Sequence, residues 1–112
     1  MRTIKIPLVD RIIIIYSGKN EWKKYCTVVN KKGCVDVGPN TCYEDIMGRC
    51  YGSWVFVHDI KDTATLIHEM SHFIDELMKN IGTDDTEFRA YITEYIMMKV
   101  IELSKENQNG ST

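Results

Sequence analysis

The sequence lacks the features that mark several classes of protein. Its first ten residues contain no unbroken apolar stretch of the signal-peptide kind, and the apolar run Ile12–Tyr16 is far too short to span a bilayer. The 14 basic and 16 acidic residues are scattered along the chain, without the basic stripe that neutralises a phosphate backbone. We therefore expect a cytoplasmic protein that binds neither membranes nor nucleic acid.

The chain also lacks closely spaced cysteine pairs. Cys26, Cys34, Cys42 and Cys50 recur every eight residues, but the segments between them share no pattern, and no C-x-x-C spacing occurs. In a reducing cytoplasm such residues are typically free, partly buried thiols. A metal site made of cysteines alone is the weaker alternative.

The composition is that of one globular domain, with 112 residues, 44% of them hydrophobic and 27% charged. Runs rich in β-branched and aromatic residues predict strands at Ile4–Val9, Arg11–Tyr16, Tyr25–Asn30 and Trp54–His58. A turn at Asn30–Gly33 would return the chain through a further strand, Cys34–Val37. The capping-box spacing of Thr41 and Glu44 predicts a short helix, Cys42–Met47, with Gly48 as its C-cap.

Helical apolar periodicity predicts two long helices in the second half of the chain. The first follows a cap at Asp62 or Thr63 and ends near Asn80, with one apolar face made of Leu66, Ile67, Met70, Phe73, Ile74, Leu77 and Met78. The second covers Thr86–Glu102, and the polar segment Ser104–Thr112 is expected to be a disordered tail. We predict a single α+β domain over residues 1–103, in which a small, mainly antiparallel sheet packs on the first long helix.

A motif that carries chemistry lies on the first long helix. His68 and His72, four residues apart, share one helix face, so both imidazoles can reach one ion, and Glu69 is close enough to hold a water on it. A catalytic zinc ion takes three protein ligands and leaves a fourth position open. We predict one Zn²⁺ per chain and a hydrolytic reaction with Glu69 as general base. The structural alternative is two solvated histidines on a polar helix face.

The second long helix offers two candidates for the third ligand. Glu87 and Glu94 share a face whose other members are Ala90, Met98 and Ile101, and carboxylates in an apolar stripe need a partner. Crossed helices favour Glu87, whereas a tight antiparallel hairpin would bring Glu94 level with His72. Glu87 could instead be a capping-box acid paired with Asp84.

The motif resembles a known family. His68-Glu69-x-x-His72 followed by Glu87-x-x-Ala90 looks like the gluzincin pattern, in which a glutamate that opens a downstream helix is the third zinc ligand. Residues 67–75 and 86–91 are similar to small, mostly uncharacterised zinc-peptidase-like proteins of phages and mobile elements. The resemblance covers residues 54–100 and implies a minimal zincin-like fold, a zinc site and peptide-bond hydrolysis. Larger gluzincins often have an aspartate four residues after the ligand glutamate, where this chain has Tyr91.

Other side chains are candidates for supporting roles. Tyr91 could stabilise an oxyanion, although packing between helices is commoner for an aromatic residue. His58, at the end of a strand, is a second candidate for the cleft. Asp75 either fixes the tautomer of a ligand histidine or is plain helix polarity. Residues 52–57 resemble the edge strand beside the zincin active helix, along which a peptide substrate adds as a further strand.

Three functions are compatible with the motif. The leading hypothesis is a metallopeptidase that acts on an extended protein or peptide segment. The second is a binding module that keeps zinc as a structural clamp, although such a module has no use for Glu69 as a base. The third is an amidase of the deformylase type with Cys50 as a ligand, although only 17 residues separate Cys50 from His68 and the Glu-Gly-Cys-Leu-Ser context is absent. The sequence leaves the oligomeric state open.

Overall fold

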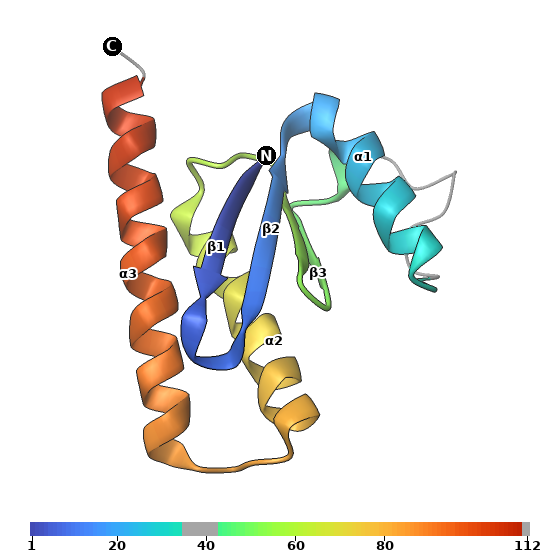
Figure 1. Cartoon of the computed structure of the whole chain (residues 1–112). Coiled ribbons are helices and arrows are strands. Elements are labelled where there is room, and N and C mark those ends of the chain that lie inside the picture. The colour runs from blue at the N-terminus through green and yellow to red at the C-terminus, as the bar shows by residue number, and fades with distance from the viewer. Residues whose placement is uncertain (35–42, 111–112) are drawn as a thin grey trace.

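The computed structural model describes residues 1–34 and 43–110, which form an α+β fold with a mixed sheet between helices (Figure 1). The described strands are β1 (Arg2–Ile6), β2 (Arg11–Ser17), β3 (Gly48–Tyr51) and β4 (Trp54–Val57). The described helices are α1 (Gly18–Lys31), α2 (Thr63–Ile81) and α3 (Thr86–Gly110), with short 3-10 turns at Pro7–Val9 and Tyr43–Asp45. The α+β class and both long helices of the second half are confirmed.

The sheet has the strand order β1-β2-β4-β3. β1 pairs antiparallel with β2, with Ile4 opposite Ile13, and β3 pairs antiparallel with β4. β2 and β4 are parallel, with Ile15 opposite Val55, because the chain between them passes through helix α1 as a crossover. The sheet is therefore mixed, and its parallel centre was not predicted.

The segment Tyr25–Asn30, predicted as a strand, belongs to helix α1. Trp22, Tyr25 and Val29 recur at helical spacing and are buried against the sheet. There they meet Phe56 of β4, whose ring centroid lies 4.7 Å from that of Trp22. Packing of this aromatic face outweighs the strand propensity of its β-branched residues.

Two predictions near residues 34–47 were wrong or lie outside the described residues. Cys34 is in no strand, and the rest of the predicted strand Cys34–Val37 lies outside the described residues, as do Thr41 and Cys42. In place of the predicted helix Cys42–Met47, the described part contains the 3-10 turn Tyr43–Asp45. Gly48 begins β3 and caps no helix.

Helix α3 is longer than predicted. It continues past Glu102 to Gly110, so the segment predicted as a disordered tail from Ser104 begins as helix. Val100 is 1% exposed and Leu103 packs against the same core cluster, so the core-facing stripe continues beyond the predicted end. Tertiary packing of this stripe stabilises a segment that local composition alone would leave unfolded.

Helix α1 covers one face of the sheet, and the opposite face packs on α2 and α3 (Figure 1). Phe73 and Leu77 of α2 are each 3% exposed and Lys79 is exposed, as predicted. Burying each such apolar side chain contributes about 1.5–3 kcal/mol. The sheet therefore holds α2 by its apolar face and leaves its polar face open.

None of the described helices is both long enough and apolar enough to cross a membrane.

Candidate metal centre

Helix α2 presents the two histidines of its motif to solvent because its apolar face is buried. The Asp62 carboxylate caps the helix and accepts hydrogen bonds from the Thr65 backbone N–H at 3.1 Å and from the Thr65 hydroxyl at 2.6 Å. The buried apolar residues of α2 are Leu66, Met70, Phe73, Ile74, Leu77 and Met78. Ile67, predicted to belong to this face, is 40% exposed. His68 and His72 lie on the exposed side of the helix.

The two histidine side chains converge. Their Nε2 atoms lie 3.2 Å apart, and their ring planes meet at 79°. Two nitrogen ligands on one tetrahedral zinc ion, each at about 2.05 Å, are separated by about 3.3 Å. The Nε2 separation of His68 and His72 therefore fits two ligands of one zinc ion.

Glu69 is the one buried charged side chain in the described part of the chain, with 6% of its surface exposed. Its carboxylate makes no hydrogen bond or salt bridge within residues 1–34 and 43–110. Burial raises the pKa of this carboxyl above its usual value, although the charges of His68, His72 and Arg49 oppose the shift. Burying a carboxylate without a hydrogen-bond partner is costly unless a ligand or ion pairs with it, which makes Glu69 a candidate functional group.

The strand β3 approaches Glu69 closely at Gly48. A Cβ at position 48 would lie 2.8 Å from Thr65 Cγ2, 2.9 Å from Glu69 Oε2 and 3.0 Å from Glu69 Cγ. Real Cβ atoms do not come this close to their neighbours. Glycine at this position therefore allows α2 and β3 to hold the carboxylate between them.

Two adjoining cavities follow the groove between β3 and α2. They enclose about 800 and 540 Å³ and share four lining residues, Gly48, Arg49, His68 and Glu69. The groove follows α2 from Ala64 to Lys79, a rise of about 22 Å. An extended chain of about six or seven residues has this length. The groove therefore fits an extended peptide that passes the histidine pair.

The strand at the edge of the groove is β3, and it is not the segment predicted from the sequence. β4, within residues 52–57, lies between β2 and β3, and β3 has β4 as its one neighbour in the described sheet. The turn at Gly52, with φ of 58°, folds β3 back along β4. Sequence reasoning missed β3 because it is short and contains glycine and arginine, which are weak strand signals. The signal that could have revealed β3 was the apolar run of β4 just beyond a glycine turn.

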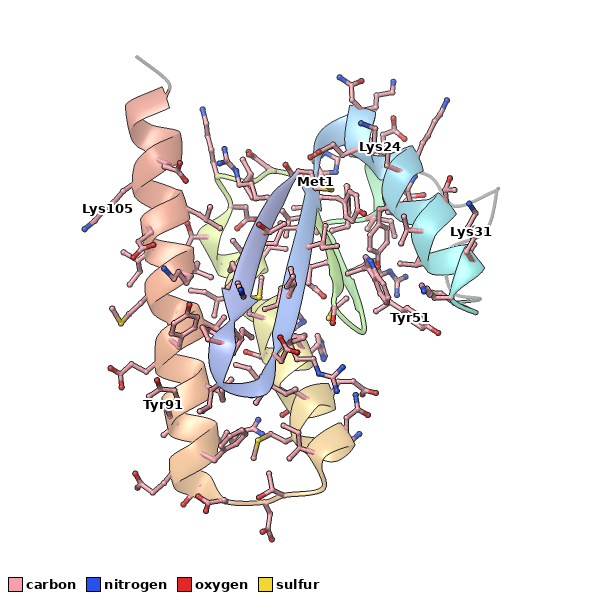
Figure 2. All side chains as sticks on the ribbon, in the orientation of Figure 1. Met1, Lys24, Lys31, Tyr51, Tyr91 and Lys105 are labelled. Atoms are coloured by element: carbon pink, nitrogen blue, oxygen red, sulfur yellow. The ribbon has the colours of Figure 1, made fainter. Side chains whose placement is uncertain are left out.

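Glu87 and Tyr91 lie outside the groove. Glu87 is exposed in the first turn of α3, and its backbone N–H donates to the Asp85 carboxylate at 2.9 Å. Phe88 N–H donates to the same carboxylate at 3.0 Å, so Asp85, and not Asp84, is the cap of this helix. Tyr91 is 55% exposed on α3 (Figure 2), so it does not pack between helices. No described residue of α3 lines either cavity.

His58 and Asp75 have structural partners. His58 Nδ1 lies 3.1 Å from the Ile46 carbonyl oxygen, and its ring stacks on Tyr43 with 4.1 Å between centroids. His58 lines neither cavity of the groove. The Asp75 carboxylate pairs with the Arg89 guanidinium, and that hydrogen bond holds the pKa of Asp75 below its usual value. Asp75 therefore ties α2 to α3 while it lines the end of the groove.

The Nε2 spacing of the histidine pair fits a zinc ion, but the pair alone is an incomplete set of ligands. Within residues 1–34 and 43–110, no three His, Cys, Asp or Glu side chains lie together in a way that could hold a metal ion. Glu87 as third ligand stays a prediction. Cys50, a free thiol, is among the residues that line the larger cavity, as are both histidines. In comparisons with known proteins, no family model, curated protein or solved structure matches this chain.

Proposed function

We propose that this chain is a cytoplasmic zinc-dependent peptidase that cleaves an extended segment of a protein or peptide. One observation carries the proposal: His68 Nε2 and His72 Nε2 converge to 3.2 Å beside the buried carboxylate of Glu69, which has no hydrogen-bond partner in the described residues. A zinc site that serves only as a clamp is closed by four protein ligands and needs no carboxylate base. The open histidine pair with an adjacent base supports hydrolysis.

Each residue has a separate task in this proposal. His68 and His72 bind the ion through Nε2, and Glu87 is the third ligand predicted from the gluzincin resemblance. Zinc, when bound, acts as a Lewis acid towards water and a carbonyl group. The Glu69 carboxylate accepts a proton from water and then delivers it to the leaving amine.

The substrate class follows from the groove. The outer edge of β3 carries backbone groups that β4 does not use, and an extended segment can pair with such an edge as a further strand. Along this edge the segment passes Gly48 and the Glu69 carboxylate behind it. Backbone pairing suits an unfolded or flexible part of another protein better than a folded surface.

The test compares two glutamates of the same groove. Glu69→Gln should retain zinc and thermal stability but lose activity by roughly 10² to 10⁴-fold, because an amide accepts no proton. Glu76→Gln, which changes a carboxylate on the same helix that lines the larger cavity, is the matched control and should stay active. His68→Ala should lose the metal, measured by native mass spectrometry, and also stability, since a site formed on folding contributes its binding energy to the fold. Full activity of Glu69→Gln would exclude the peptidase mechanism and favour the binding module.

The substrate is found with the same variant. The Glu69→Gln protein serves as bait in a lysate of its own cell, and the captured proteins are incubated with wild type. Cleavage of a captured protein by wild type, and not by Glu69→Gln, supports the proposal.

A separate experiment tests the third ligand. Glu87→Ala should weaken zinc binding as strongly as His68→Ala, and Glu94→Ala should not. The reverse ranking would show that the gluzincin analogy misplaced the ligand.

A second candidate function is favoured by the position of Cys50. This thiol lines the larger cavity together with His68 and His72, as a deformylase-type amidase with a cysteine ligand would require. Loss of zinc in Cys50→Ser would favour the amidase, and full zinc content would favour the peptidase. Burial, together with the charges of Glu69 and Glu76, raises the pKa of Cys50 to about 12, so the thiol stays protonated near neutral pH in the protein described.

A further inference from the structure

Helix α3 has apolar side chains on two opposite faces. The inner face packs into the core through Ile92, Ile96 and Val100, each at most 1% exposed. On the opposite face Tyr91, Met98 and Ile101 are 55%, 54% and 53% exposed. A surface helix normally has one apolar face, so the second one indicates a contact that the single chain does not make.

The exposed face has the spacing of a helix–helix contact. We call Tyr91, Glu94, Met98, Ile101 and Lys105 the outer stripe; their spacing alternates between three and four residues, as positions a and d of a heptad do. α3 forms one side of the molecule (Figure 1), and Lys105 extends away from the sheet (Figure 2). A second helix can therefore approach the outer stripe without meeting the rest of the chain.

The charges of the outer stripe select its partner and its direction. Glu94 and Lys105 flank Met98 and Ile101, and neither charge has a salt-bridge partner among the described side chains. When two α3 helices pack antiparallel about a two-fold axis between residues 99 and 100, Met98 faces Ile101 and Glu94 faces Lys105 across the axis. Parallel packing would place Glu94 opposite Glu94 and Lys105 opposite Lys105, so like charges would face each other. Moving the antiparallel axis by one heptad towards Glu94 would leave the two Glu94 carboxylates near the centre of the contact without a cation.

We propose that a second copy of this chain covers the outer stripe and forms an antiparallel two-fold dimer through α3. The contact is self-complementary, as a two-fold interface requires. Residues 91–105 span about 21 Å of helix, which places the interface at the small end of the range for specific contacts. The dimer is therefore reversible and concentration-dependent.

The first test measures mass in solution. Sedimentation equilibrium of wild type should show an average mass that rises from 13.0 kDa at low concentration towards twice that value. Met98→Gln with Ile101→Gln should remain at 13.0 kDa at every concentration. Leu8→Gln, which removes an equally apolar side chain that is 59% exposed outside the stripe, should associate like wild type. A wild type that remains monomeric, or a Met98/Ile101 variant that still dimerises, overturns the proposal.

The second test checks the antiparallel register by reversing charges. Glu94→Lys and Lys105→Glu should each associate about tenfold or more weakly than wild type, because each places like charges opposite one another twice. An equal mixture of the two variants should dimerise again, since every facing pair then has opposite charges. A mixture that stays monomeric overturns the register. Mass is measured and not activity, so either outcome leaves the proposed peptidase function untouched.

Discussion

Replacing Gly48 by alanine tests whether the edge strand positions Glu69. The new Cβ would lie 2.8 Å from Thr65 Cγ2 and 2.9 Å from Glu69 Oε2. Carbon atoms in ordinary contact are about 3.5–4.0 Å apart, so the side chains of Thr65 and Glu69, or the elements that carry them, must move by about 0.7 Å. Gly48 does not have a positive φ, so this overlap, and not backbone strain, is the perturbation.

The overlap sets the size of the effect. Overpacking of this kind destabilises a protein by about 1–3 kcal/mol, which for a domain of this size lowers the melting temperature by about 4–12 °C. Displacing the general base by a fraction of an ångström should in addition reduce kcat by up to about 10²-fold. Zinc content should remain that of wild type, because the atoms nearest the added methyl group belong to Thr65 and Glu69 and not to either histidine.

The assay is a thermal melt followed by a rescue. Thr65→Ser removes the Cγ2 atom but keeps the hydroxyl that bonds to Asp62, so Gly48→Ala with Thr65→Ser should recover part of the lost stability. Thr65→Ser alone serves as the control and should melt close to wild type. An unchanged melting temperature for Gly48→Ala, or no recovery in the double variant, would refute the close approach of β3 to Glu69.

Further predictions concern stability, pH and reactivity. The pKa of Asp75 is lowered by its hydrogen bond from Arg89, so the pair stabilises the fold above the unfolded pKa of about 3.9, and this contribution disappears as the pH falls through the lower folded value. Asp75→Asn should therefore melt below wild type at pH 7, and the two melting curves should converge in acid; a constant difference would contradict the pairing. Phe56→Ala removes a ring with no exposed surface and should lower the free energy of unfolding, measured in urea, by about 3–5 kcal/mol. Ile12 is 51% exposed, so the control Ile12→Ala should change that free energy by less than about 0.5 kcal/mol. The Cys50 thiol, with its pKa raised to about 12, should react with iodoacetamide at pH 8 much more slowly than a free thiol in a peptide; equal rates would contradict its burial.

Local patterns in the sequence were sufficient for the second half of the chain. Helix α2 begins at Thr63 after Asp62, one of the two predicted caps, and ends one residue beyond the predicted Asn80, because its capping residue and its apolar stripe are both local features. The same periodicity predicted that His68 and His72 share the face opposite Phe73 and Leu77. Residues four apart on a helix must be neighbours, so the histidine pair required no tertiary information.

The tertiary structure decided the rest of the site and half of the fold. Tyr25–Asn30 forms helix because Trp22, Tyr25 and Val29 pack on Phe56, a residue far along the chain whose contact no local pattern reveals. The burial of Glu69 depends on the close approach of Gly48. Tyr91 and His58 lie outside the groove because of how α3 and the segment before β3 pack. Spacing along a helix determines which side chains share a face, because the geometry is fixed by the backbone. Which groups meet across elements depends on how the buried surfaces fit together, and that is a property of the folded chain.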